Sequence, residues 1–185
     1  MNSLTRKEPC MNSSVEKSEP CQVCEFQENL NILREIYFFS VLPLEVLKVF
    51  AYLCTREKFK TGDYLFTQDD DDGQSFFFIS GQAELIRTDN GVDETIRTYN
   101  AGDFSGALSL LSNTRRLFSL KAISPVICLV LSREKFIHTM DQHPQYMGSV
   151  FQAIIEKIHG WEEMFISERS AGCNACRRKI GVSLI

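Results

Sequence analysis

The feature that most constrains this chain is a succession of short apolar runs between Thr55 and Ser132, separated by turn residues. Apolar runs such as Phe76 to Ile79 and Val126 to Leu131 have the length of strands, and Asp89-Asn90-Gly91 is typical of a hairpin turn. Short strands at close spacing with turn signals indicate an antiparallel barrel or sandwich. The sequence therefore predicts a mainly β core, with turns at Gly62, Gly81, Gly91 and Gly102.

Helical periodicity flanks this core on both sides. Apolar residues recur at helical spacing before residue 54, and a long apolar stripe follows from Gln145 to Phe165. This stripe is broader than one barrel wall can cover, which predicts a homodimer formed through the long helix. The expected organisation is an N-terminal arm (1–25), helices (26–54), a barrel (55–131), C-terminal helices (132–165) and a tail (166–185), with 26–165 forming one domain.

Residues 100–122 combine a turn, a short helix and two arginines. Gly102-Asp103 is the turn, Gly106 to Leu111 is the expected helix, and Arg115 and Arg116 follow a polar loop. Free backbone N–H groups at a helix start attract anions, and a guanidinium can bind an anion bidentately. The pattern is consistent with a phosphate pocket. The alternative is a β-hairpin with a helical excursion and two solvated arginines.

This stretch resembles the phosphate-binding cassette of the cyclic nucleotide-binding domain family, which includes the catabolite activator protein. The family pattern is G-D-F-F-G-E-[LI]-A-L-L, a loop, and then R-[ST]-A-[ST]-V-x-A. Two further segments, Lys60 to Gln68 and Ser75 to Leu85, resemble other family signatures, and the resemblance covers roughly Phe38 to Trp161. It implies a double-stranded β-helix (jelly-roll) barrel with an N-terminal helical bundle and a long C-terminal helix. The matching residues are Gly102, Asp103, Phe104, Gly106, Leu108, Ser109, Leu110, Leu111, Arg116, Ser119 and Ala122.

The same resemblance implies a regulatory protein that is not an enzyme and that binds a cyclic nucleotide, with cAMP favoured. The phosphate would meet Arg116 and the backbone N–H groups of residues 106–108, with Arg115 as a reserve cation. The base would face Ile154 or Ile158 of the long helix. The expected ligand-binding residues are Gly81, Ser105, Gly106, Ala107, Leu108, Arg115, Arg116, Phe118, Ser119, Ile154 and Ile158.

Two residues of the cassette depart from the family pattern. Ala107 stands where the family has a glutamate that accepts a hydrogen bond from the ribose 2′-hydroxyl. Phe118 stands where the family has a small residue, and its ring would crowd the phosphate. A lost charge-assisted hydrogen bond is worth about 1.5–3 kcal/mol, or about one to two decades of affinity. We therefore expect weak cyclic nucleotide binding.

Two cysteine pairs suggest a different kind of function. Cys21 and Cys24 lie near one end of the chain, and Cys173 and Cys176 near the other. Two such pairs are the usual way to build a four-thiolate zinc site, and an iron–sulfur cluster is a rival. The alternative function is a metal- or redox-sensing scaffold with a degenerate nucleotide pocket. The pairs are remote in sequence, so unpaired thiols in the tails remain an open interpretation.

Composition and charge limit the remaining possibilities. The chain has 44% hydrophobic and 24% charged residues and a net charge of −4, so nothing supports a primary nucleic-acid role. There is no apolar run of membrane-spanning length and no signal-peptide pattern, so we expect a cytoplasmic protein. We also expect a stand-alone sensor without a DNA-binding domain; the sequence does not name its effector. Asp69 to Asp72 lack the alternating spacing of a calcium loop and predict a solvated hairpin loop.

Overall fold

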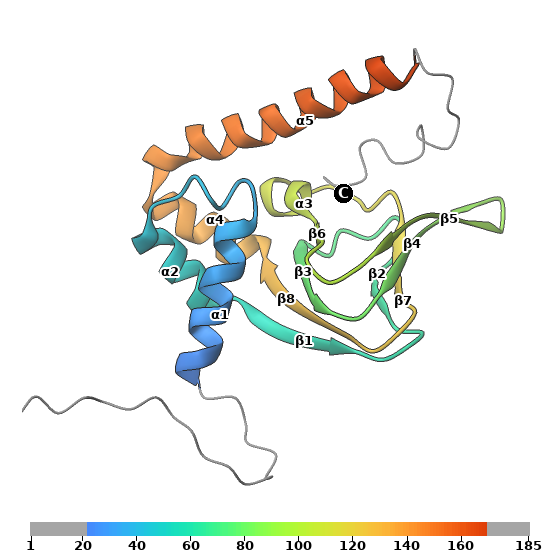
Figure 1. Cartoon of the computed structure of the whole chain (residues 1–185), viewed down its shortest axis with the longest axis horizontal. Coiled ribbons are helices and arrows are strands. Elements are labelled where there is room, and N and C mark those ends of the chain that lie inside the picture. Colours follow the sequence, from blue (N-terminus) through green and yellow to red (C-terminus); the bar gives the residue numbers. More distant parts are fainter. Residues whose placement is uncertain (1–21, 170–185) are drawn as a thin grey trace, which may run out of the picture.

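The computed structural model describes residues 22–169, in which two facing β-sheets are flanked by helices on one side (Figure 1). The helices are α1 (Gln22–Glu35), α2 (Leu44–Leu53), α3 (Ala107–Leu111), α4 (Arg133–Gln142) and α5 (Met147–Arg169), with a short 3-10 turn, η1 (Pro144–Tyr146), before α5. The strands are β1 (Thr55–Phe59), β2 (Tyr64–Phe66), β3 (Gln74–Ser80), β4 (Ala83–Asp89), β5 (Val92–Tyr99), β6 (Phe104–Ser105), β7 (Ser119–Ala122) and β8 (Val126–Ser132).

The sheets are antiparallel throughout the described residues. One has the strand order β1-β8-β3-β6 and the other β2-β7-β4-β5, so strands distant in sequence become neighbours. In the pairing of β3 with β8, Phe76 lies opposite Val130 and Phe78 opposite Cys128. This arrangement confirms the predicted jelly-roll fold, mainly β with flanking helices.

Strands β3 and β8 are buried on both faces, which explains their nearly continuous apolar sequences. Successive side chains of a strand point to opposite faces. Phe76 and Phe78 therefore lie in the core between the sheets, whereas Phe77 lies in the core beneath the helices. On β8, Val130 faces the first core and Leu131 the second. The two cores thus meet along these strands.

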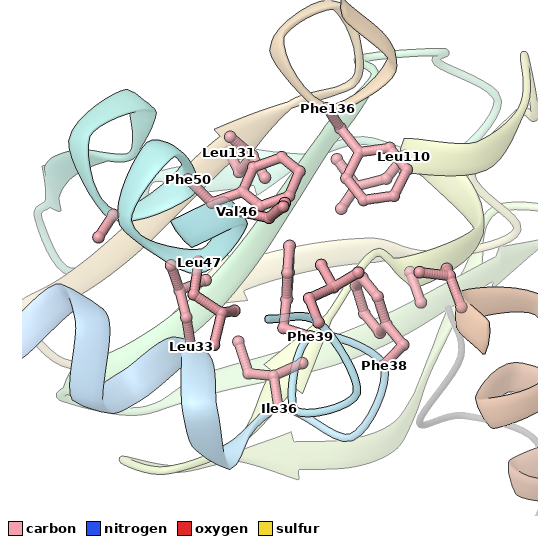
Figure 2. Close-up of a cluster of buried hydrophobic side chains, with 14 of the residues drawn as sticks. Leu33, Ile36, Phe38, Phe39, Val46, Leu47, Phe50, Leu110, Leu131 and Phe136 are labelled. Carbon is pink, nitrogen blue, oxygen red and sulfur yellow. The ribbon is translucent and has the colours of Figure 1, made fainter. Parts of the chain in front are cut away.

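The helical layer packs on this shared wall through aromatic side chains (Figure 2). The rings of Phe50 on α2 and Phe136 on α4 stack with their centroids 5.5 Å apart. Phe38 and Phe39, in the connection between α1 and α2, have ring centroids 4.4 Å apart and contribute to the same core. Burying each such ring stabilises the fold by about 1.5–3 kcal/mol, so these contacts fix the helices on the sheet.

Some element boundaries differ from those expected from sequence. Helix α1 begins at Gln22, ahead of the predicted start at residue 26, and α5 begins at Met147 because η1 occupies Pro144–Tyr146. Proline fixes its own backbone angle and suits the first position of a helical turn. The expected arm (1–25) and tail (166–185) lie outside the described residues, apart from 22–25 and 166–169.

The apolar stripe of α5 is divided between a buried and an exposed edge. Val150 and Ile154 are buried in the helical core, whereas Phe151, Ile155 and Ile158 are 48%, 57% and 37% exposed. The helical core therefore covers only part of this apolar stripe, and these three residues are exposed to solvent. Of the helices described, none combines the length and the apolar character that crossing a bilayer requires.

Candidate functional site

Gly106 places the start of α3 directly against β3. Its φ is +99°, and a Cβ at this position would lie 2.6 Å from the backbone oxygen of Gln74. No other residue fits, because an L side chain is strained at this φ and would also collide with the strand. Leu110 (0% exposed) and Ala107 (1%) then anchor α3 in the helical core. The cassette helix is thus fixed at both its start and its buried face.

The two arginines that follow α3 have opposite environments. Arg115 is exposed, whereas the side chain of Arg116 is only 1% exposed. The backbone N–H of Arg116 donates to Asp70 O at 2.8 Å, and the N–H of Asp69 donates to Arg116 O at 2.8 Å. This pair of hydrogen bonds brings the loop between β2 and β3 alongside Arg116, although the two segments are remote in sequence.

The guanidinium of Arg116 is held by a carboxylate of that loop. Its Nε donates to Asp72 Oδ1 at 2.7 Å and its Nη2 to Asp72 Oδ2 at 2.9 Å. Nη2 also donates to Gln74 O at 2.6 Å, and the guanidinium carbon lies 3.9 Å from the centroid of the Phe66 ring. A buried arginine needs a counter-ion, and Asp72 supplies it in bidentate geometry.

A surface hollow of about 370 Å³ adjoins this arginine. It lies between α3 and the loop that follows, and it brings together several residues of the predicted cassette. Its lining residues are Leu108, Ser109, Thr114, Arg115, Arg116 and Leu117.

Three further predicted residues lie on strands or in the core near Arg116. Ser119 is buried at the start of β7, and its Oγ accepts a hydrogen bond from the Gln68 N–H at 2.9 Å. The ring of Phe118 packs against the core between the sheets. Ser105 is fully buried on β6. These residues build the walls of the cassette.

The structure does not bring every predicted residue to this place. Gly81 follows the far end of β3 from Gln74, where a Cβ would lie 2.2 Å from Pro125 O, so its role is close packing. Ile154 is 4% exposed and packs in the helical core, which leaves it facing neither the hollow nor solvent. Ile158 is part of the exposed edge of α5.

Ala107 gives the cassette no polar side chain at the position of the family glutamate. Its methyl group is buried against the helical core. A ribose hydroxyl would therefore have to find another partner.

The acidic loop was only partly predicted. Asp69 and Asp70 are exposed, as expected for a solvated loop, but Asp71 and Asp72 form ion pairs with Arg133 and Arg116. The Arg133 hydrogen bond holds the pKa of Asp71 below its ordinary value. Sequence reasoning missed these partners. Their neighbours in the sequence gave little signal, because Arg116 follows Arg115 and Arg133 lies between Ser132 and Glu134.

The predicted metal site falls almost wholly outside the described residues. Cys21, Cys173 and Cys176 lie there, and Cys24 is exposed on α1. Within residues 22–169, no group of three potential ligands (His, Cys, Asp or Glu) is placed to hold a metal ion. A zinc or iron–sulfur site formed by the two cysteine pairs stays a prediction.

Known proteins resemble this chain in sequence and in fold. The chain is 35% identical over 106 residues to a cAMP-dependent protein kinase regulatory subunit of Emericella nidulans; the match covers 56% of this chain but only 25% of that protein. The N-terminal domain of a transcriptional regulator from Streptomyces coelicolor superposes with a TM-score of 0.64 at 19% identity, covering 72% of this chain and 93% of the other.

The regulatory subunit of a cAMP-independent protein kinase A from Trypanosoma cruzi, bound to guanosine, gives a TM-score of 0.59 at 20% identity, covering 73% of this chain and 46% of that one. Such low identities show a shared fold. The sequence model of the cyclic nucleotide-binding domain matches residues 56–143. Residues 56–143, which include most of both sheets, are therefore similar to a cyclic nucleotide-binding domain.

Proposed function

We propose that this domain is a regulatory module that binds a cyclic nucleotide weakly, with cAMP as the first candidate. The observation that carries the proposal is the buried guanidinium of Arg116 beside α3, in the wall of the hollow. The similarity to a cAMP-dependent kinase regulatory subunit supports cAMP.

The ion pair with Asp72 explains why binding would be weak. A phosphate approaching Arg116 meets a cation that is already neutralised, so it has to share or displace the Asp72 carboxylate. Asp72 is 19% exposed, whereas Arg116 is 1% exposed, so the carboxylate is the member that can move toward water. The missing polar group at Ala107 removes a second source of affinity. The residues present can bind a cyclic phosphate only if the acidic loop moves and Asp72 releases the Arg116 guanidinium.

The same ion pair favours a second candidate, an uncharged nucleoside. Such a ligand would carry no charge to compete with Asp72 and would not require the pair to open. The guanosine-bound regulatory subunit from Trypanosoma cruzi shares this fold and gives a precedent for a nucleoside ligand. The two candidates differ in one measurable respect, which is whether removing the Asp72 charge strengthens binding.

Calorimetric titration of the full chain with cAMP, cGMP, adenosine and guanosine tests these proposals. Under the first, cAMP or cGMP binds, Asp72→Asn tightens binding, and Arg116→Lys weakens it, because lysine cannot make the bidentate contact. Arg34→Ala is the control, because this arginine is exposed on α1 and is not among the residues that line the hollow. Binding of guanosine or adenosine alone supports the second candidate. If no ligand binds at millimolar concentration, the domain is a structural member of its family.

We further propose that α5 forms a homodimer contact through its exposed edge. Phe151, Ile155 and Ile158 are the apolar residues of that edge. Isolated apolar side chains on a surface are ordinary, but a helical stripe that continues a buried face is typical of an interface. Light scattering after size exclusion tests the proposal: a dimer that becomes monomeric on Ile155→Glu supports it, and a monomer at micromolar wild-type protein contradicts it.

A further inference from the structure

Arg133, the first residue of α4, contacts three separate segments. Its Nε donates to Ser109 O of α3 at 2.6 Å, and its Nη1 donates to Asn113 Oδ1 of the following loop at 2.7 Å. Both Nη atoms bind the carboxylate of Asp71 in the acidic loop. The backbone N–H of Arg133 adds a fourth contact, to Gly73 O at 2.6 Å.

The acidic loop is shaped to receive this side chain. Gly73 has a φ of +61°, and a Cβ built there would lie 3.3 Å from the guanidinium carbon of Arg133. The neighbour would have to give way to any side chain at this position. Glycine therefore allows the loop to close around the guanidinium.

Helix stability alone does not account for an arginine at this position. The start of a helix carries partial positive charge, so a cation in the first turn is unfavourable there. The side chain of Arg133 is only 14% exposed, which distinguishes it from a solvated surface arginine. Its contacts compensate for this placement by joining α4 to α3 and to the acidic loop.

The Asp71 and Asp72 carboxylates are adjacent in sequence and bind different arginines. Asp71 binds Arg133, whereas Asp72 binds Arg116. Ser109, whose carbonyl accepts the Arg133 hydrogen bond, also lines the hollow beside Arg116. One arginine therefore holds both the helix and the loop that surround the candidate ligand site.

We infer that Arg133 is a positioning residue for this site: it sets where α3 and Asp72 stand relative to Arg116. Because Arg133 is also the first residue of α4, a ligand that displaces Asp72 shifts the acidic loop, and this loop contacts α4 through Arg133. This coupling to α4 rests on the proposed ligand function, whereas the positioning of α3 and Arg116 does not.

Hydrogen exchange measured by NMR on the ligand-free full chain tests the positioning. In Arg133→Gln, the α3 amides and the Arg116 Nε–H should exchange at least about tenfold faster than in the wild type, the change expected when about 1.4 kcal/mol of local stability is lost. Arg56→Gln is the matched control, because Arg56 is similarly buried and joins α1 to β1 through Glu28 and Asn29. Unchanged exchange in Arg133→Gln, or equal acceleration in both variants, overturns the inference.

Two further measurements keep the test decisive. If Arg133→Gln does not fold, Asn113→Ala removes a single contact and should accelerate exchange in α3 alone; no acceleration then overturns the inference. With cAMP as the probe, wild-type α4 amide signals should shift on binding, and those shifts should disappear in Arg133→Gln. Shifts that persist in the variant overturn the coupling. If the wild type binds no cAMP, the proposed function fails, while the ligand-free exchange rates still decide the role of Arg133.

Discussion

Replacing Asp72 with alanine removes the counter-ion of an arginine whose side chain is 1% exposed. Two hydrogen bonds, of 2.7 and 2.9 Å, are lost, while the contacts of the guanidinium with Gln74 O and the Phe66 ring remain. Breaking a buried ion pair on one side costs about 3–5 kcal/mol. Asp72 is itself 19% exposed, so water can reach part of the vacated space. We therefore expect a loss near the lower end, about 3 kcal/mol, or about two decades in the unfolding equilibrium.

Urea unfolding followed by far-ultraviolet circular dichroism measures this loss, read from the midpoint at unchanged slope. Asp89→Ala is the control, because the Arg87–Asp89 pair is 41% and 63% exposed and its loss should leave the urea midpoint nearly unchanged. The double variant Asp72→Ala with Arg116→Met should recover most of the loss, since an apolar side chain suits this surrounding. Equal small losses in the two single variants would show that Arg116 is solvated and would refute the reasoning.

Three more outcomes are expected. Burial raises the pKa of the Cys54 and Cys128 thiols to about 12, so iodoacetamide at about pH 8 should label them, by mass spectrometry, only after unfolding. Gly106→Ala should lower the unfolding free energy by at least about 1–2 kcal/mol in urea, from the left-handed backbone alone, with the contact to Gln74 O adding to it. The pKa of Asp71 is lowered in the folded state, so its ion pair contributes stability above the ordinary value of 3.8 that is lost as pH falls through the lowered value. The urea midpoint of Asp71→Asn should therefore approach that of the wild type in acid.

Local signals were enough to predict the architecture. Gly62, Gly81, Gly91 and Gly102 all have positive φ, as turns between strands require, and the apolar run at Val126 forms the doubly buried β8. These features depend on neighbouring residues in the chain, which is why pattern and periodicity reveal them.

The candidate site was harder to predict because its contacts depend on sheet register. The sequence singled out Arg116, but its partner Asp72 lies in a loop brought close only by the pairing of β2 with β7 and of β3 with β8. Ile154 shows the same limit of sequence reasoning. Its apolar character was clear from the sequence, but the surface that it covers depends on how α5 crosses the other helices. The spacing of residues along the chain reveals neither the pairing of Arg116 with Asp72 nor the packing of Ile154.

The doubly buried wall formed by β3 and β8 has a mechanical consequence. It is one strand thick, and alternate residues such as Phe76 and Phe77 belong to different compartments. Protein interiors are close-packed and not readily compressed. Any swelling of the space between the sheets, whether from a ligand or from a larger side chain, therefore displaces the helices directly, even where no polar contact joins them. Substitutions on β8 are correspondingly constrained, because each must suit the volume of one compartment without moving the other.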